Sequence, residues 1–297
     1  MRTVMSTDKR TILTIGHSPD ADDAFMFFAL AKGKVTIDGY DGVEHVMEDI
    51  ESLNHRARRG DLDVTAISAA VYPLVADKYR IMACGASVGR DYGPILIANR
   101  HATTGDLAGK RIGVPGTYTT AYLLLRLYMP APFQPVMLPF ERIMEAVASK
   151  EVDAGVIIHE GQLTWAAQGF EKILDLGEAW MDDTKLPIPL GLDVIHRRLG
   201  AERHQRITKA MEASIRYARA NEDDAIDYAL EFGRGIERET CRRFVRMYVN
   251  DDTMNMGAEG KRALELLYER AFARGILPAL PEDPGTHSPL LDIVGLK

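Results

Sequence analysis

His159 is the residue whose place in the sequence points most directly to chemistry. It follows the apolar run 154–158 in the segment AGVIIHE, so we expect its side chain at the end of a buried strand, facing a cleft. An imidazole there can take up a proton near neutral pH and act as a general base. The alternative is a histidine that is hydrogen-bonded within the core. The neighbouring Glu160 either orients the imidazole ring or only begins the next helix.

The segment 110–128, KRIGVPGTYTTAYLLLRLY, predicts a strand, a glycine turn and a helix. Thr119 and Thr120 bring hydroxyls to the point where the first amides of the new helix lack partners. These amides and the positive end of the helix point at the same spot, which suits an acidic or oxygen-rich small molecule. The alternative is that the two threonines only cap the helix.

A third group of polar residues lies in HSPDADD, where His17 precedes Asp20, Asp22 and Asp23. Carboxylates and an imidazole could hold a metal ion. We favour an acidic helix start, because it explains the aspartates without a metal and no second set of ligands recurs downstream. The chain also lacks the G-x-S-x-G, P-loop and G-x-G-x-x-G motifs of acyl-enzyme, triphosphate and dinucleotide chemistry. We therefore expect neither a metal nor an organic cofactor.

Alternating strands and helices must position these residues. The expected strands of the first part are 11–16, 43–47, 63–67, 80–85 and 93–98, and the expected helices are 24–31, 49–60 and 69–76. Such spacing is typical of right-handed β-α-β units in a largely parallel sheet, where ligands collect beyond the carboxyl ends of the strands. The loop 17–23, Ser68 and the turn 116–120 fall at such ends. From the pattern alone, Ser68 is first a helix cap, and Asn54 lies on a solvated helix face unless the cleft reaches it.

After residue 99 the alternating pattern restarts. Strands are expected at 111–114, near 136, at 154–158, 173–176 and 192–195, with helices up to 129, at 141–150 and through 165. The Pro-rich segment LPIPLG is expected to be a connection, the part after residue 200 mostly amphipathic helix, and the tail after residue 277 irregular.

This pattern predicts two α/β lobes. We expect residues 1–98 and 193–297 to form a large discontinuous lobe and residues 99–192 a small one, with the ligand cleft between them. The two crossings are expected near 97–100 and 190–195, where a hinge could open and close the cleft.

Bulk properties narrow the class of partner. The 297 residues carry a formal net charge of −7, which argues against a nucleic-acid partner. Cys84 and Cys241 lie far apart without C-x-x-C spacing, so we expect both to be reduced and buried. The first ten residues hold no apolar stretch long enough for an export signal, and the apolar run 24–31 is too short to cross a bilayer. We expect a cytoplasmic protein with a small-molecule substrate and no membrane partner; its oligomeric state stays open, with a homodimer as one option.

Five segments in this order and spacing carry a resemblance to a known family: HSPDADDAFMFFAL, EDIESLN, TAIS, GVPGTYTTAYLLLRLY and AGVIIHEGQLTW. With them, about residues 11–275 resemble the 1,4-dihydroxy-6-naphthoate synthases of the futalosine route to menaquinone. The resemblance implies a two-lobed α/β fold of the type II periplasmic-binding-protein-like kind, with mixed, mostly parallel sheets and a helical C-terminal part. It also implies a cofactor-free lyase reaction, in which cyclic dehypoxanthinylfutalosine gives 1,4-dihydroxy-6-naphthoate and dihydroxyacetone.

The resemblance also implies roles for particular residues. The histidine of the family's IIHE motif, the general base, falls on His159. The expected substrate contacts are Thr65, Ala66, Ile67, Ser68, Thr119 and Thr120, together with Asp23 and Asn54. One departure bears on the substrate: the family often has SPCPNDTF where this chain has SPDADDAF. Asp22 thus replaces an asparagine and adds a negative charge, which disfavours an anionic substrate group close to it.

Two alternatives stay open. The chorismate dehydratase of the same pathway resembles this family in fold and also acts on a small carboxylated molecule. A protein that binds a small anion and does no chemistry is the alternative from another class, because fold does not determine function. The missing export signal argues against a transport role, and a histidine at the cleft end of a strand favours catalysis.

Overall fold

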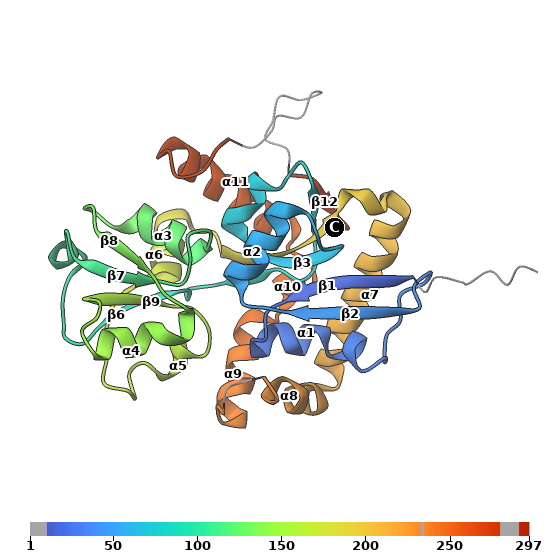
Figure 1. The fold of residues 1–297 in the computed structure, drawn as a ribbon, viewed down its shortest axis with the longest axis horizontal. Helices are drawn as coiled ribbons and strands as arrows, with labels where there is room; N and C mark the ends of the chain where they lie inside the picture. Colours follow the sequence, from blue (N-terminus) through green and yellow to red (C-terminus); the bar gives the residue numbers. More distant parts are fainter. Residues whose placement is uncertain (1–10, 233–234, 280–290, 297) are drawn as a thin grey trace, which may run out of the picture.

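The computed structural model describes residues 11–232, 235–279 and 291–296, and it contains two β-sheets that each carry their own helices (Figure 1). The seven-stranded sheet has the order β12-β4-β11-β3-β1-β2, with β5 beside β11. Its strands are β1 Ile12–His17, β2 Gly42–Met47, β3 Val64–Ser68, β4 Tyr79–Met82, β5 Ser87–Gly89, β11 Ile188–His196 and β12 Ile293–Val294. The five-stranded sheet has the order β10-β6-β9-β7-β8. Its strands are β6 Ile95–Ala98, β7 Arg111–Val114, β8 Gln134–Met137, β9 Ala154–Ile157 and β10 Glu171–Asp175.

Helices connect and cover the strands. The α-helices are α1 Ala21–Ala31, α2 Ile50–Arg59, α3 Thr120–Tyr128, α4 Ile143–Ala148, α5 Gly161–Thr164, α6 Leu176–Thr184, α7 Ala201–Ala220, α8 Glu222–Leu230, α9 Arg238–Tyr248, α10 Asp251–Met254 and α11 Gly257–Ala273. Short 3₁₀ turns are η1 Ala69–Leu74, η2 Thr104–Leu107, η3 Phe140–Arg142 and η4 Arg197–Leu199. The order of strands and helices follows the prediction through most of the chain. Within the described residues, no helix combines the length and the apolar character needed to cross a membrane.

Both sheets are mixed, as expected, but parallel pairing does not predominate. Five of the strand pairings are parallel and five are antiparallel. Every antiparallel pairing involves β6 or β11. These are the first strands after the chain has passed from one sheet to the other, so they enter the new sheet against the direction of its β-α-β units.

The passages between the sheets lie earlier than expected. Because β5 belongs to the large sheet and β6 to the small one, the first passage is the segment 90–94 and not 97–100. The Pro-rich segment was expected to be a connection, but residues 188–191 are part of β11 and pair with β3 and β5. The second passage is therefore 185–187, after α6, a helix that the sequence analysis missed. Residues 95–98 therefore belong to the sheet of the small lobe, and residues 188–192 to the sheet of the large lobe. The exact bounds of the two lobes stay a prediction.

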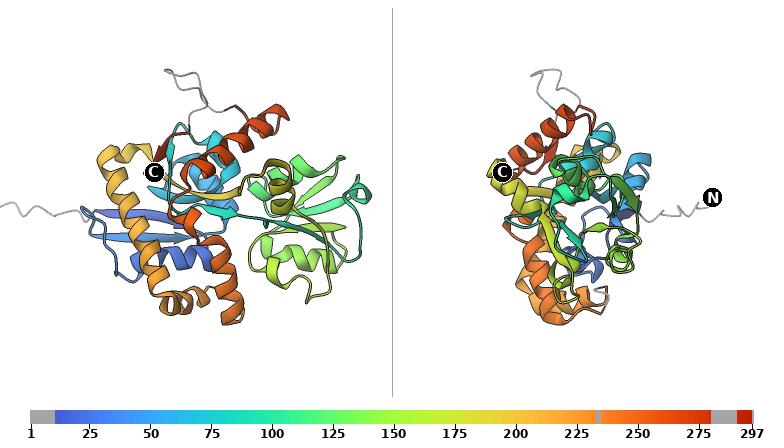
Figure 2. Two further views of the ribbon diagram at one scale, coloured as in Figure 1. Left: turned by 180° about the vertical axis from the view of Figure 1, so that it is seen from behind. Right: turned by 90° about the vertical axis from the view of Figure 1, so that its left-hand side faces the viewer.

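The C-terminal helices complete the large lobe. All residues of α1 from Ala21 to Leu30 are buried, because α7, α8 and α9 pack around this helix. Helix α11 instead reaches toward the small lobe (Figure 2), where it contacts α3. The apolar side chains of α11 share one core with those of η1, β11, α3 and α6. The two lobes are thus joined by a common apolar core along α11.

Three local expectations need correction. Segment 69–76 forms the 3₁₀ turn η1 around Pro73 and not a longer helix. Ser68 precedes it, but its side chain makes no capping hydrogen bond. The tail was expected to be irregular, yet β12 pairs with β4 in parallel; the prolines at 281, 284 and 289 lie outside the described residues. Both cysteines are buried and free, as expected.

Candidate active site

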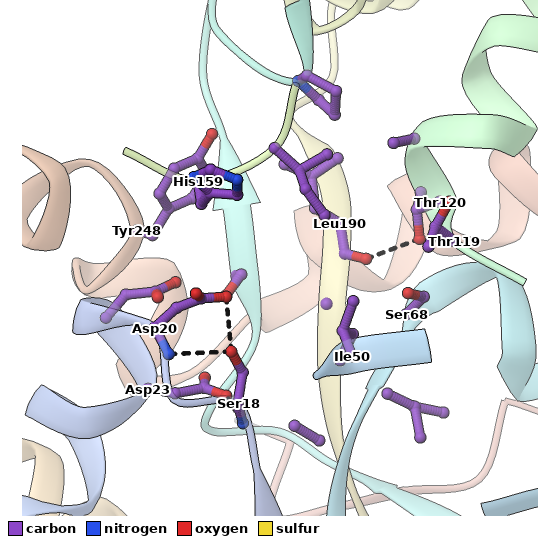
Figure 3. Close-up of a pocket in the computed structure, with 18 of the residues that line it drawn as sticks. Ser18, Asp20, Asp23, Ile50, Ser68, Thr119, Thr120, His159, Leu190 and Tyr248 are labelled. Atoms are coloured by element: carbon purple, nitrogen blue, oxygen red, sulfur yellow. Dashed lines mark hydrogen bonds between the residues drawn. The ribbon is translucent and has the colours of Figure 1, made fainter. Parts of the chain in front are cut away.

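A pocket lies between the two lobes, where β1, β3, β7 and β9 end and the chain continues into the loops and helix starts singled out above (Figure 3). It encloses about 130 Å³, on the order of ten times the space that one water molecule needs, so it suits a small molecule. Of the residues predicted from the sequence, seven line it: Asp23, Ala66, Ile67, Ser68, Thr119, Thr120 and His159. The tertiary structure therefore brings together segments that are up to 136 positions apart in the sequence.

Thr65 and Asn54 do not line the pocket, so direct substrate contact by these two side chains is not what the structure supports. Thr65 is fully buried, and its hydroxyl donates to the Ala66 carbonyl at 3.0 Å. Asn54 is also fully buried and not on a solvated face. Its Oδ1 accepts from the Ser68 amide at 2.8 Å and its Nδ2 donates to Ser68 Oγ at 3.1 Å. Asn54 thus fixes Ser68, whose hydroxyl proton has no acceptor among the described residues and is available to a ligand.

The hydroxyls of the threonine turn are used differently from the prediction. Thr119 caps α3, because its Oγ1 accepts from the Tyr122 amide at 3.2 Å and donates to the Gly116 carbonyl at 3.0 Å. Thr120 Oγ1 donates to the Leu190 carbonyl at 2.7 Å and accepts from the Ala70 amide at 3.2 Å. Both hydroxyl protons are therefore already used within the protein. The donors left over are the backbone amides of Thr120 and Ala121, which have no acceptor among the described residues and belong to residues that line the pocket.

His159 lies on the opposite side of the pocket from Thr119 and Thr120 (Figure 3). Its Nε2 is buried and has no hydrogen-bond partner among the described residues. Its ring packs against Phe140 with 4.6 Å between centroids. Its backbone φ is 119°, a region that residues other than glycine rarely enter and that carries strain. A strained backbone that holds an unpartnered imidazole nitrogen at a pocket is an arrangement suited to proton transfer.

Glu160 lies against the same ring. Its Oε2 is 3.3 Å from His159 Nδ1, and its Oε1 accepts from the Ala21 amide of the large lobe at 3.4 Å. The side chain is buried, so it is more than the start of a helix. Glu160 connects the candidate base to the opposite lobe.

Carboxyl groups crowd the start of α1. Asp20, Asp22 and Asp23 line the pocket. Burial, reinforced by the negative charges of Asp23, Asp20 and Glu160, raises the pKa of Asp22 well above its usual range. Burial raises the pKa of Asp23 in the same way, and the negative charge of Asp193 is the next-largest cause. The carboxyls of Asp22 and Asp23 are therefore held toward their protonated form.

His17 does not join this group. It stacks on Phe27 with 4.5 Å between centroids, and its Nε2 lies 3.1 Å from His45 Nδ1. Burial lowers the pKa of His17 to about 4, so it is a neutral core histidine at neutral pH. In the described part of the chain, no three His, Cys, Asp or Glu side chains are arranged so that they could hold a metal ion.

The comparisons with known proteins agree with one another over most of the chain. The family model described as menaquinone biosynthesis matches residues 13–273. The chain belongs to the menaquinone biosynthesis family. Two of its members, both named 1,4-dihydroxy-6-naphthoate synthase, are 38% identical to this chain and match 91% of it: one from Streptomyces coelicolor, of which 96% is covered, and one from Thermus thermophilus, of which 97% is covered.

Solved structures show the fold of this family member. The crystal structure of protein AF1704 from Archaeoglobus fulgidus is 50% identical, with a TM-score of 0.86 over 90% of this chain and 98% of that one. The alkanesulfonate-binding protein SsuA from Xanthomonas axonopodis pv. citri is 15% identical, with a TM-score of 0.69 over 92% and 96%. The second likeness concerns the fold alone, which is the periplasmic-binding-protein-like fold expected from the sequence.

Several pocket residues of this family member were missed by the sequence analysis. Tyr248 on α9 is buried at the pocket, and its hydroxyl donates to Gln162 Oε1 at 2.7 Å. Leu190, Gly191 and Leu192 line the pocket from β11. Nothing near them in the sequence marks a site, because β11 and α9 come to the pocket only through long-range packing. The aspartate Asp20 was seen as part of an acidic helix start, but its contact with Ser18 Oγ at 2.6 Å places it on the pocket wall.

Proposed function

We propose that this chain cleaves cyclic dehypoxanthinylfutalosine to 1,4-dihydroxy-6-naphthoate and dihydroxyacetone, with His159 as general base. The observation that carries the proposal is the buried, unpartnered Nε2 of His159 at the pocket between the lobes. Two relatives that carry the name 1,4-dihydroxy-6-naphthoate synthase support the choice of reaction, because each matches nearly the full length of this chain.

The first step is removal of a proton from the substrate by His159 Nε2. The electron pair of the broken C–H bond then forms a double bond to the neighbouring carbon, the bond from that carbon to the departing group breaks, and the imidazolium returns the proton to the departing group. General base catalysis of this kind contributes about 10²-fold to 10⁴-fold to the rate.

Negative charge that develops on a substrate oxygen needs donors on the opposite side of the pocket. The amides of Thr120 and Ala121 and the hydroxyl of Ser68 are unused by the protein and belong to the pocket wall. Amides at the start of a helix favour negative charge, and preorganised donors stabilise a transition state that carries it. In this proposal Thr119 and Thr120 act through their backbone and cap, and not by donating their hydroxyl protons.

Apolar side chains between these two sides suit a ring system. Ile50, Ile67, Ile158, Leu190 and Phe244 line the pocket. Flat aromatic rings are commonly held by such apolar walls with a few polar groups that set orientation.

Asp22 stands where the family often has asparagine, but this difference disfavours an anionic substrate group less than a full negative charge would. The raised pKa of Asp22 means that its carboxyl is held toward the neutral form. A neutral carboxyl can donate and accept hydrogen bonds much as the side-chain amide of asparagine does. The proposal therefore keeps an oxygen-rich substrate beside Asp22.

The direct test mixes the purified protein with cyclic dehypoxanthinylfutalosine and follows 1,4-dihydroxy-6-naphthoate by mass-resolved chromatography. His159→Asn is the matched variant, because asparagine enters positive φ more readily than most residues. We expect product from the parent, and a loss of about 10²-fold or more in turnover by the variant with nearly unchanged binding. If the parent makes no product but binds a small carboxylate, the protein is an anion-binding protein and not this enzyme. If it converts chorismate, the dehydratase alternative is supported.

Three further expectations are proposed with this function. A cytoplasmic location can be tested by fractionation of cells that express the protein. A small-molecule substrate without nucleic-acid or membrane partners is consistent with the pocket. Assembly as a homodimer is the option that sedimentation of the purified protein would test.

A further inference from the structure

Glu160 contacts both the candidate base and the opposite lobe, so its role extends beyond orienting the imidazole ring. One carboxylate oxygen of Glu160 is 3.3 Å from His159 Nδ1, and the other accepts from the Ala21 amide at 3.4 Å. His159 and Glu160 follow β9 of the small lobe, whereas Ala21 is the first residue of α1 in the large lobe. A single buried carboxylate thus holds the base and the opposite lobe together.

Nδ1 of His159 has a second neighbour. Donation to Glu160 requires a proton on Nδ1, whereas this neighbour requires Nδ1 to be unprotonated. The Gly161 amide lies 3.3 Å from the same nitrogen and can only donate to it. If Nδ1 accepts from Gly161, a neutral ring carries its proton on Nε2. If Nδ1 carries the proton, it donates to Glu160, and Nε2 is left with a free lone pair.

Only the second tautomer can act as a base toward the pocket through Nε2. Which tautomer is present depends on whether the Glu160 carboxylate is held beside Nδ1, and the Ala21 amide holds it there only while the lobes are together. We propose that Glu160 is a positioning residue that selects the Nδ1-protonated form of His159 and does so when the two lobes are closed. The proposal rests on the proposed function of His159 as general base.

In the proton transfer, Nε2 gains the substrate proton while the proton on Nδ1 stays hydrogen-bonded to Glu160. The positive charge of the imidazolium then pairs with the carboxylate inside a buried site, where such pairing is strong. Other groups also face Glu160: Asp22 of α1 and Cys241 of α9 feel its charge. Neither of them is placed between Glu160 and Nδ1 by any hydrogen bond of the described residues.

The first test reads the tautomer without any substrate. In protein with ¹⁵N-labelled histidine, the nitrogen signals of neutral His159 are expected to show the proton on Nδ1. Glu160→Leu removes both acceptor oxygens at similar side-chain length, and we expect the proton to move to Nε2. Glu141→Leu is the matched control, because Glu141 is an exposed carboxylate nearby on the same lobe. A wild-type ring protonated on Nε2, or an unchanged tautomer in Glu160→Leu, would overturn the proposal.

The second test breaks only the contact across the lobes. Ala21 is the first residue of α1, a position where proline is tolerated because the amide has no partner inside the helix. Ala21→Pro therefore deletes the amide of the large lobe that donates to Glu160 Oε1. We expect kcat to fall about tenfold or more, with a smaller change in KM, in a variant that melts near the wild type. A folded variant with unchanged kcat would overturn the link to lobe closure. If thermal unfolding shows that the proline ring prevents folding, the ¹⁵N signals of His159 in the wild type and in Glu160→Leu test the proposal instead.

The two proposals can fail separately. A wild-type protein that shows the Nδ1 proton but makes no 1,4-dihydroxy-6-naphthoate would contradict the proposed reaction and support the role of Glu160. An active wild type whose Glu160→Leu variant keeps full turnover and the same tautomer would support the reaction and contradict the role of Glu160.

Discussion

Asp193 is a buried residue whose ionisation the fold strongly constrains. It lies inside β11 and is 1% exposed, and neither carboxyl oxygen has a hydrogen-bond partner among the described residues. Its Oδ2 faces Gly85, where an added Cβ would come within 2.0 Å of it. Burial raises the pKa of Asp193 to about 8. A carboxyl in this position is kept neutral because the core offers nothing that would stabilise its charge.

This residue makes protein stability depend on pH. In the unfolded chain an aspartate titrates near 3.8, so the folded state binds a proton that the unfolded state releases between pH 3.8 and about 8. Stability contributed by this group is present below pH 3.8 and is lost as the pH rises through about 8. One pKa unit corresponds to about 1.4 kcal/mol, which sets an upper limit of roughly 5 to 6 kcal/mol for the loss.

Asp193→Asn should therefore be more stable than the parent at pH 8 and nearly equal to it at pH 4. Urea unfolding at several pH values would measure this, and the slope of unfolding free energy against pH should become shallower in the variant. Asp22 and Asp23 also have raised pKa values, so part of the slope should remain. Identical slopes for parent and variant would show that Asp193 does not titrate in this range.

At the scale of elements, α3 has two functions at its N-terminus. The first-turn residues Thr120 and Ala121, whose amides have no acceptor among the described residues, line the pocket, while Thr119 satisfies the amide of Tyr122. In the proposed function, the cap uses one amide of this helix start and leaves two others for the substrate. The cap also holds the turn after β7 in place, because Thr119 Oγ1 donates to the Gly116 carbonyl at 3.0 Å.

Thr119→Ala separates the cap from the ligand role. Loss of an N-cap hydroxyl costs about 1 kcal/mol, so we expect a lower urea midpoint with only a small change in turnover. Thr119→Ser keeps the hydroxyl and should restore the midpoint. A variant with unchanged stability but strongly reduced turnover would mean that the hydroxyl contacts the substrate directly.

At the scale of the whole molecule, polar contacts bridge the lobes beside the pocket while α11 joins them through an apolar core. Both oxygens of Glu51 on α2 are 3.2 Å from the Tyr118 amide before α3. Gly116 permits this close approach, since a Cβ there would lie 2.4 Å from Glu51 Cδ. Arg58 of the large lobe also bonds to the Tyr118 hydroxyl. Polar contacts therefore join the two lobes at the edge beside the pocket.

Glu51→Ala should weaken the contact between the lobes. It also removes an acceptor of Asn54 Nδ2 at 3.3 Å, but Asn54 keeps its two hydrogen bonds to Ser68. A hydrogen bond to a charged group contributes about 1.5 to 3 kcal/mol, and partial exposure of Glu51 places the expected effect at the lower end. We expect KM for the substrate to rise roughly tenfold with kcat nearly unchanged, and small-angle X-ray scattering to report a larger radius of gyration. Glu44→Ala, at an exposed carboxylate of β2, serves as the control. Equal KM values for the two variants would show that the Glu51 contact does not hold the lobes together.

The local sequence determined most of the elements and pointed to the candidate base. Helix α2 illustrates this, because Asp49 caps it through the amides of Glu51 and Ser52 and Gly60 ends it with a φ of 79°. His159 could be found because an apolar strand ends directly before it. Helix α6 was missed although Asp175 caps it in a similar way, because its short acidic sequence has little apolar periodicity.

Only the tertiary structure decided which polar side chains share a pocket and which are buried beneath it. Asn54 looked like a solvated position on α2, but β3 packs on that helix and turns Asn54 toward Ser68. Tyr248 and Asp193 carry no local signal, since a tyrosine in a helix and an aspartate between apolar strand residues acquire their roles from what packs around them. The same holds for Glu160: its neighbour His159 is set by the sequence, whereas the Ala21 amide reaches it only because two lobes built from distant segments close on each other. Periodicity and caps are properties of short segments, while burial and contacts across the cleft depend on the packing of the whole chain.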